Sequence, residues 1–153
     1  MINIKKIAVA IDFSENAPKI IDSAAFFANK FGADLCIVHV VESLDDYSGF
    51  VIPHISLEKL EQDLLKGAES KMASFIEDYM EERKTSTPFK TKVLVGDVGQ
   101  ELKKYIEQEK CALLVIGTHG YKGLEKTLFG SIAEKVLKIN PCPVLTVNPY
   151  KVK

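Results

Sequence analysis

The feature that most constrains the fold is a series of five short apolar runs, separated by longer segments with helical periodicity. The runs cover residues 4–11, 35–41, 89–95, 112–116 and 143–147. They are short and nearly continuous rather than alternating, as expected of strands that are covered on both faces. Because strands alternate with helices, and each right-handed crossover lays its helix on the sheet, the pattern predicts an α/β fold: a doubly wound, Rossmann-like sheet of five parallel strands with helices on both faces.

The ends of the first two helices can also be predicted. Ser14 is the expected N-cap of the first helix, Pro18 lies in its tolerated first turn, and Gly32 ends it. Ser56 opens a second, long helix, and Gly67 is expected to weaken its middle. No composition shift indicates a second domain, so we expect one domain over residues 1–153.

Composition excludes several classes of protein. The 153 residues carry 20 Lys and Arg against 21 Asp and Glu, and a net charge of −1 offers no basic surface for a nucleic-acid backbone. We therefore expect no nucleic-acid partner. No apolar stretch approaches the roughly 20 residues of a membrane span. Because the first residues also do not resemble a secretory leader, we expect a cytoplasmic protein. Cys36, Cys111 and Cys142 are widely separated, which disfavours a metal site and predicts buried thiols.

Glycines gather where the chain leaves the fourth strand. Gly117, Gly120 and Gly123 share one loop, and Gly130 directly precedes the last helix, which starts at Ser131. Ligands of open α/β sheets bind beyond the carboxyl ends of the strands, and N–H groups at a helix start bind anions. The loop therefore predicts a phosphate site, although glycines that only form turns are an equal alternative. The chain has neither a G-x-x-x-x-G-K-[ST] P-loop nor a G-x-G-x-x-G after its first strand, which disfavours P-loop phosphoryl transfer and hydride transfer.

Spacing favours the phosphate interpretation. Gly117, Gly120, Gly130 and Ser131 form the pattern G-x2-G-x9-G-[ST] between the fourth strand and the last helix. In this motif the chain resembles the universal stress protein family, in its ATP-binding branch. The resemblance extends over essentially the whole chain, through segments 10–14, 39–41, 96–97 and 141–147.

The resemblance implies nucleotide-binding roles for Asp12, Val40, Gly117, His119, Gly120, Gly130 and Ser131. The carboxylate of Asp12 would lie near the ribose hydroxyls, and Val40 would offer backbone groups to the adenine edge. The first two glycines would let the chain pass beside the ribose and phosphates, and the last glycine and the serine would bind phosphate at the helix start. His119 is within reach of phosphate but could equally point to solvent. Ala133 replaces a hydroxyl that some relatives place near the phosphates, which would weaken triphosphate binding.

These expectations favour a nucleotide-dependent regulator or sensor over a metabolic catalyst. No carboxylate or lysine stands at a spacing that would orient water toward a γ-phosphate, so we expect at most slow ATP hydrolysis. The expected ligand is ATP, ADP or AMP. Mg²⁺ would accompany the phosphates, because the chain offers no oxygen cage of its own. Two alternatives remain open: an enzyme of the wider adenine-nucleotide α/β group, such as an ATP pyrophosphatase or nucleotidyl transferase, and an interaction module that binds no nucleotide.

The resemblance also implies assembly. It places the last strand at an edge of the sheet, where the apolar residues 144–147 are expected to pair with a second copy and give a homodimer. A proline at Leu145 is then expected to weaken the dimer by removing a ladder donor. We also expect a regulatory protein partner, which the sequence does not identify.

Overall fold

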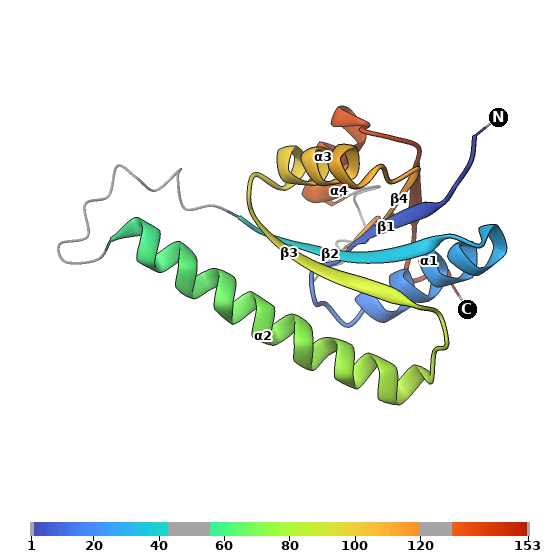
Figure 1. Cartoon of the computed structure of the whole chain (residues 1–153), viewed down its shortest axis with the longest axis horizontal. Coiled ribbons are helices and arrows are strands. Elements are labelled where there is room, and N and C mark those ends of the chain that lie inside the picture. Colours follow the sequence, from blue (N-terminus) through green and yellow to red (C-terminus); the bar gives the residue numbers. More distant parts are fainter. Residues whose placement is uncertain (1, 43–55, 120–129, 153) are drawn as a thin grey trace.

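The computed structural model describes residues 2–42, 56–119 and 130–152, and it confirms the predicted α/β architecture. The strands are β1 (Lys6–Ala10), β2 (Asp34–Glu42), β3 (Phe89–Gly96), β4 (Leu113–Gly117) and β5 (Val144–Val147). The helices are α1 (Ala17–Phe31), α2 (Leu57–Arg83), α3 (Val98–Glu109) and α4 (Ser131–Ile139). Within the described residues, the five strands form one parallel sheet (Figure 1).

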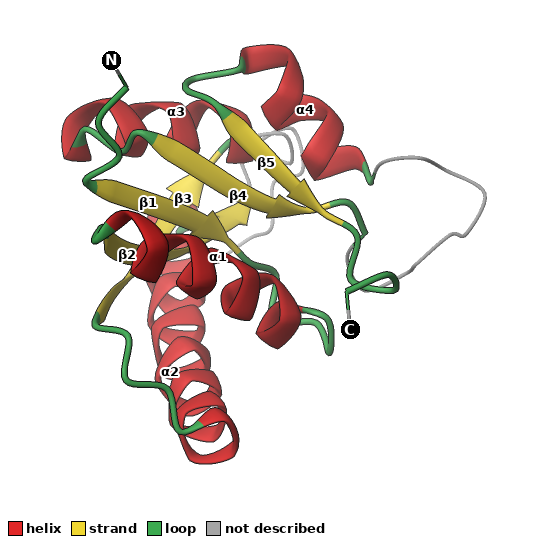
Figure 2. Ribbon diagram, turned by 90° about the vertical axis from the view of Figure 1, so that its right-hand side faces the viewer, coloured by secondary structure: helices red, strands yellow, loops and turns green. Residues whose placement is uncertain are grey.

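The strand order is β3-β2-β1-β4-β5. From β1 the chain moves outward through β2 to β3, and it then returns to the other side of β1 for β4 and β5. The right-handed connections therefore place α1 and α2 on one face of the sheet and α3 and α4 on the other (Figure 2). The side on which successive strands are added therefore changes between β1 and β4, and the carboxyl edge between these two strands is where such a sheet binds ligands.

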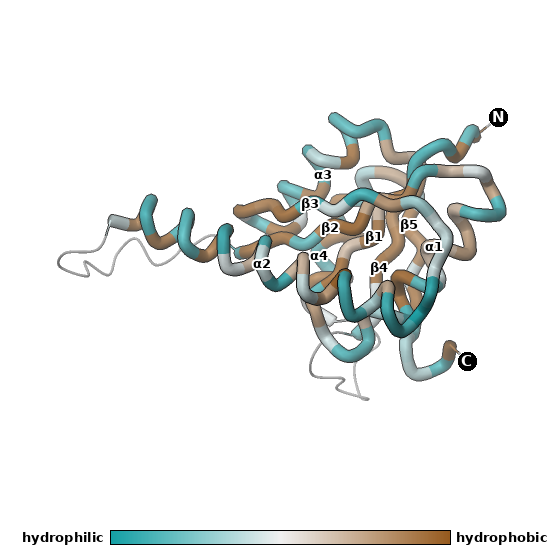
Figure 3. The backbone as a smooth tube through the Cα atoms, turned by 60° about the horizontal axis from the view of Figure 1, so that its bottom comes forward, coloured by the Kyte–Doolittle hydropathy of each residue, from teal (hydrophilic) through white to brown (hydrophobic). Residues whose placement is uncertain are grey.

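One apolar cluster on each face of the sheet holds the layers together. Val9 of β1 belongs to the cluster that contains Ile21 of α1, whereas Val38 of β2 belongs to the cluster of Leu102 in α3 and Val136 in α4. Figure 3 shows the hydrophobic strands enclosed between helices whose outer faces are hydrophilic. Full burial of one such side chain contributes about 1.5–3 kcal/mol, so both faces of the sheet are needed for stability.

The start of α1 differs from the prediction. Its N-cap is Asn16, and no side chain caps it, so the prediction of Ser14 is wrong. Ser14 instead belongs to a tight turn after β1, in which its carbonyl accepts the N–H of Ala17 at 3.0 Å. The predictions of Pro18 in the first turn and of Gly32 at the end are confirmed, because Gly32 adopts φ +61° at the C-cap.

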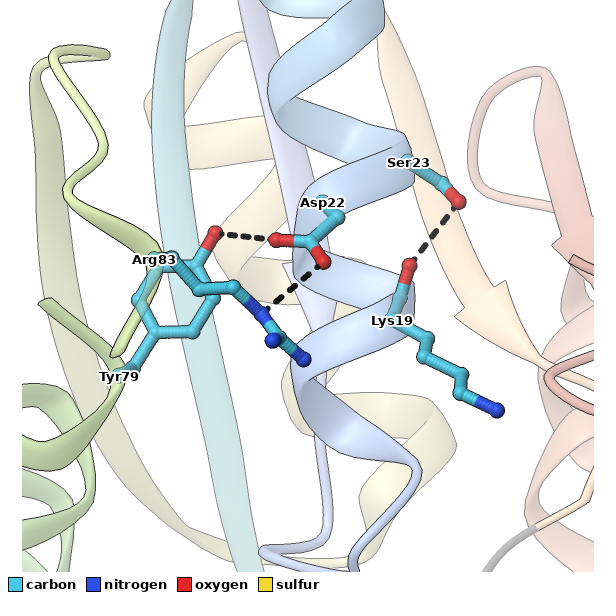
Figure 4. A network of polar contacts seen from close by, with 5 residues as sticks. All are labelled: Lys19, Asp22, Ser23, Tyr79 and Arg83. Carbon is cyan, nitrogen blue, oxygen red and sulfur yellow. Dashed lines mark hydrogen bonds and ion pairs between the residues drawn. The ribbon is translucent and has the colours of Figure 1, made fainter. Parts of the chain in front are cut away.

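The helix α2 is long and is anchored mainly through its second half. Ser56 caps it as predicted, accepting a backbone N–H of the first turn at 3.0 Å. The residues of α2 that are fully buried are Met72 and Tyr79, and Figure 1 shows the first turns extending past the end of β2. Figure 4 shows the anchor: the Tyr79 hydroxyl donates to Asp22 of α1 at 2.8 Å, and Arg83 pairs with the same carboxylate at 3.2 Å. Neither α2 nor any other helix in the described segments is long and apolar enough to cross a membrane.

The cysteines only partly follow the prediction. Cys36 and Cys111 are buried in the cluster between the sheet and α3, as expected. Cys142 is half-buried rather than buried, which corrects the prediction. It lies in the turn between α4 and the edge strand β5, where fewer elements cover it.

Candidate functional site

The structure brings the predicted site residues to the carboxyl edge at the reversal of strand order. Asp12 follows β1, Val40 lies near the end of β2, and Gly117 ends β4. The N–H of Gly130 donates to the carbonyl of Thr118 at 2.7 Å, which holds the start of α4 beside the end of β4. Residues from four elements therefore meet at one edge of the sheet.

Two of the predicted residues are described only in part or not at all. Gly120 lies outside the described residues. The backbone of Ser131 forms the first residue of α4, but its side chain lies outside the description. The predictions for Gly120 and for the Ser131 hydroxyl therefore stay predictions.

The backbone of Val40 faces the space beyond the end of β1. The register of β1 with β2 ends at the pair Ala10 and Val38, and the N–H of Ile11 donates to the Val38 carbonyl at 2.9 Å. Alternate residues of a strand direct their backbone groups toward the same neighbour. The N–H and C=O of Val40 consequently point toward the position that β1 would occupy if it continued, and they form a donor–acceptor pair suited to the edge of a heterocycle.

A tight turn fixes Asp12 at the mouth of this space. Its Oδ1 accepts the N–H of Ser14 at 3.0 Å, and the intervening Phe13 has φ +60°. Left-handed backbone is uncommon in a bulky residue, so the turn is held by its surroundings. The Ser14 hydroxyl is 1% exposed and has no hydrogen-bond partner among the described residues. A buried polar atom of this kind at a ligand-binding edge suggests a water or ligand partner.

The start of α4 is bare. Gly130 is its N-cap, with φ −70° and ψ 164°, and no side chain caps the first turn. A Cβ at this position would meet the Thr118 carbonyl at 3.5 Å, which is ordinary van der Waals contact. Neither backbone conformation nor packing against the described residues therefore requires glycine here. Room for the close approach of a ligand is one reason for which a glycine can stand at such a position.

Gly117 has a different explanation. A Cβ at Gly117 would lie 2.4 Å from Cδ1 of Ile20, a buried residue of α1. A side chain at this position would force the end of the Ile20 side chain to shift, so packing between β4 and α1 favours a glycine here. The motif combines one packing glycine with one glycine at the bare helix start.

The family model of the universal stress protein family matches residues 3–148. The chain belongs to this family. It is 33% identical over 148 residues to universal stress protein MJ0531 of Methanocaldococcus jannaschii, covering 96% of this chain and 84% of the relative. It is 34% identical over 146 residues to universal stress protein A homolog 1 of Coxiella burnetii, covering 94% and 95% of the two chains.

Solved structures of universal stress proteins share the fold. UspA from Lactobacillus plantarum superposes with a TM-score of 0.77 at 22% identity, covering 95% of this chain and 99% of that one. A universal stress protein in complex with cAMP gives 0.63 at 20% identity, covering 95% and 97%. One from Archaeoglobus fulgidus in complex with dAMP gives 0.61 at 21% identity, covering 97% and 100%.

His119 of this universal stress protein contacts the side chains of two residues in the described part of the chain. Its Nδ1 is 2.8 Å from Oγ1 of Thr118, and its ring meets the ring of Tyr150 edge-on, with centroids 5.6 Å apart. The sequence left open whether His119 faces the site or solvent. In the structure it is half-buried beside the start of α4. The sequence pattern did not identify Thr118 and Tyr150 as neighbours of the His119 ring. Tyr150 lies in a short tail that carries no recognisable motif.

A hollow of about 350 Å³ opens beneath α2, next to the site. Among its lining residues are Asp12, Phe13, His39, Gly67 and Lys71. Nδ1–H of His39 donates to the carbonyl at position 11 at 2.7 Å, and burial lowers the pKa of His39, which favours the neutral ring. The prediction of His39 as a strand residue is confirmed. The side chain of His39 lines a hollow because α2 lies over it, and the sequence pattern does not reveal the position of α2.

The described residues do not form a metal centre of their own. Segments 2–42, 56–119 and 130–152 contain no group of three or more His, Cys, Asp or Glu side chains placed to hold an ion. Asp12 is the carboxylate among the predicted site residues.

Proposed function

We propose that this universal stress protein binds an adenine nucleotide at the carboxyl edge between β1 and β4 and acts as a nucleotide-dependent regulator or sensor. The observation that carries the proposal is the bare start of α4, where Gly130 is required neither by its φ of −70° nor by packing against the described residues. Uncapped N–H groups and the helix dipole favour an anion there. The complexes of two relatives with cAMP and dAMP support an adenine nucleotide as the ligand.

The order of groups along the edge favours one direction for the nucleotide. The adenine would bind the N–H and C=O of Val40, and the ribose hydroxyls would bind the carboxylate of Asp12. The phosphates would then lie at the start of α4, at Gly130 and Ser131, with His119 beside them and with Gly117 and Gly120 lining the path. This direction keeps the negative charge of Asp12 away from the phosphates, which repulsion between like charges requires.

ATP is the favoured ligand, with ADP and AMP as alternatives, and Mg²⁺ would enter with the phosphates. Hydrolysis would be slow, because the described part of the edge offers no evident general base for water. We further propose a cytoplasmic role in the stress response, a homodimer formed through β5, and a regulatory protein partner.

Calorimetric titration with ATP, AMP and adenosine, with and without Mg²⁺, tests the proposal. A valine at Gly130 would place a branched side chain before the anion site. We expect Gly130→Val to weaken ATP binding by about 1–3 kcal/mol, roughly 5- to 150-fold, through loss of N–H contacts to phosphate. Backbone strain does not contribute, because Gly130 has φ −70°.

Two further variants calibrate this result. Gly130→Ala adds one carbon in ordinary contact and should cost less affinity than the valine. Ser131→Ala should cost only about 0.5–1.5 kcal/mol, the value of one neutral hydrogen bond. Undiminished ATP affinity of the folded valine variant would place the phosphates elsewhere, and a wild-type protein that binds no adenine nucleotide would refute the proposed function.

A further inference from the structure

The C-terminal turn, residues 148–152, is fastened to α1 and lies beside the candidate site. The side chain of Pro149 is fully buried, and its carbonyl accepts a hydrogen bond from Nζ of Lys19 at 3.1 Å. Within the turn, the N–H of Tyr150 donates to Oδ1 of Asn148 at 3.0 Å. The turn follows β5 directly, and the Val147 carbonyl accepts the N–H of Thr118 at 2.9 Å. The turn therefore has a fixed position relative to the end of β4.

Tyr150 reaches from this turn to His119. The two rings meet at 66° with centroids 5.6 Å apart, an edge-to-face contact. Nδ2 of Asn16, a buried residue before α1, donates to the Tyr150 hydroxyl at 3.4 Å. Tyr150 is nevertheless 54% exposed, so it contributes less to the core than a buried aromatic residue would. Its specific contacts go to His119 and Asn16.

We propose that Tyr150 is a positioning residue that, through His119, sets the affinity of the site for the phosphates of the nucleotide. The proposal rests on the proposed function, which assigns His119 a phosphate contact. Thr118 connects His119 with the start of α4. Its carbonyl accepts the Gly130 N–H there, and its hydroxyl lies 2.8 Å from Nδ1 of His119.

The contacts that Thr118 and Tyr150 make with His119 have complementary effects. When the Thr118 hydroxyl donates to Nδ1, the ring proton of neutral His119 resides on Nε2, and Nε2–H can donate to a phosphate oxygen. The edge of Tyr150 restricts rotation of the ring about the side-chain bonds. Without Tyr150 the imidazole samples other orientations, and binding must order it again. Adenosine has no phosphate and should not respond.

Titration of ATP and adenosine against wild type, Tyr150→Ala and Tyr150→Phe tests the proposal. We expect Tyr150→Ala to weaken ATP binding about 2- to 13-fold, the range found for an aromatic pair, and to leave adenosine binding unchanged. Tyr150→Phe keeps the ring and should retain most of the ATP affinity. Val152→Ala, an exposed position in the same turn, is the matched control and should change neither affinity.

A double-mutant cycle with His119→Ala decides whether Tyr150 acts through His119. In the His119→Ala background, Tyr150→Ala should have no further effect on ATP binding. An equal loss in both backgrounds, or an equal loss for adenosine, would overturn the proposal in favour of a general structural role. Wild-type affinity for ATP in Tyr150→Ala would overturn it while leaving the proposed function intact.

A measurement without nucleotide separates the two proposals. Long-range ¹H–¹⁵N spectra report which ring nitrogen of His119 carries the proton and whether the ring samples several states. We expect one dominant tautomer, protonated on Nε2, in wild type and mixed or broadened signals in Tyr150→Ala. Identical spectra would contradict positioning by Tyr150 whatever the nucleotide titrations give, whereas loss of nucleotide binding by wild type would first refute the proposed function.

Discussion

Gly117 and Gly130 show how one sequence motif can contain residues retained for different physical reasons. At Gly117 the added Cβ would lie 2.4 Å from Cδ1 of Ile20, whereas at Gly130 it would make ordinary contact. The sequence pattern treats both positions alike, because spacing reveals neither φ nor neighbours. Only the structure separates a packing requirement from room for a ligand.

The packing requirement predicts a specific rescue. Gly117→Ala should lower the free energy of unfolding by about 1–3 kcal/mol, because the buried Ile20 has little room to move. Ile20→Val removes Cδ1, the atom that clashes, so the double variant should lose less stability than the sum of the two single changes. Urea denaturation of the four proteins measures this, with Gly130→Ala as the control glycine. Strict additivity would contradict the clash.

His39 predicts a dependence of stability on pH. Burial lowers the pKa of His39 in the folded protein, so the unfolded chain takes up the proton first as the pH falls. The free energy of unfolding should therefore decrease as pH falls through about 6.5, the pKa of histidine in an unfolded chain. His39→Asn keeps an N–H donor for the Ile11 carbonyl but does not titrate. Urea denaturation across pH 7.5 to 5.5 should show a shallower loss in the variant, and parallel profiles would exclude this contribution.

At the scale of single elements, α2 combines an anchored half with a projecting half. Tyr79 and Arg83 fasten its last turns to Asp22, while Leu57 and Leu64 in its first turns are exposed. An element held at one end opens locally from the other end. The sequence predicted the start of α2 at Ser56, but its anchoring depends on contacts with α1 that lie far away in the chain.

Two glycines at open positions predict stability changes of opposite sign. A Cβ at Gly67, within α2, or at Gly32, after α1, would meet nothing within 4 Å. Gly67→Ala should stabilise α2 by about 0.8–1.0 kcal/mol, because alanine favours the helix. Gly32→Ala should destabilise the protein by about 1–2 kcal/mol, because Gly32 has φ +61°. Thermal unfolding gives both signs, and hydrogen exchange should show slower exchange in the first half of α2 for Gly67→Ala. A stabilising Gly32→Ala would contradict the left-handed C-cap.

At the scale of the whole molecule, β5 is an edge strand, as the resemblance implied. The carbonyls of Pro143 and Val147 accept N–H groups of the β4 segment, at 3.0 and 2.9 Å. By alternation, the backbone of Leu145 also faces β4, and the groups of Val144 and Thr146 face outward. A proline at Leu145 would therefore damage the sheet within the protomer, so it is the wrong test of a dimer.

The outward-facing donor gives the better test. Thr146→Pro should weaken a homodimer formed through β5 by removing an outward N–H, while largely preserving the fold. Leu145→Pro should lower the free energy of unfolding instead, since it removes a bond between β5 and β4. Sedimentation at micromolar concentration, together with urea denaturation, distinguishes the two effects. A wild-type protein that sediments as a 17.0 kDa monomer would contradict the dimer.

The sequence predicted the elements better than their contacts. Apolar periodicity located the strands and the sheet, since burial on both faces leaves a local pattern along the chain. Ser14 was misplaced as a cap because the turn after β1 depends on Asp12 accepting its N–H. The resemblance implied one site for Asp12, Val40 and Gly117, and the fold brings these residues to one edge of the sheet, while their binding roles stay predictions. The position of Tyr150 could not be predicted, because it depends on a C-terminal turn that is fastened to α1 through Lys19.

The central position of β1 has a consequence for the order in which the protein can form. One neighbour of β1 is β2, which is close in the sequence, but its other neighbour is β4, so that Ile7 lies beside Leu113. Long-range parallel pairing is slow, since loop-closure entropy opposes it until both strands exist. The first half of the sheet can therefore assemble on the ribosome while the edge between β1 and β4 is still incomplete. The other residues of the candidate site, on β4 and α4, join Asp12 only after the final third of the chain has emerged. A nucleotide could therefore favour only the last step of folding.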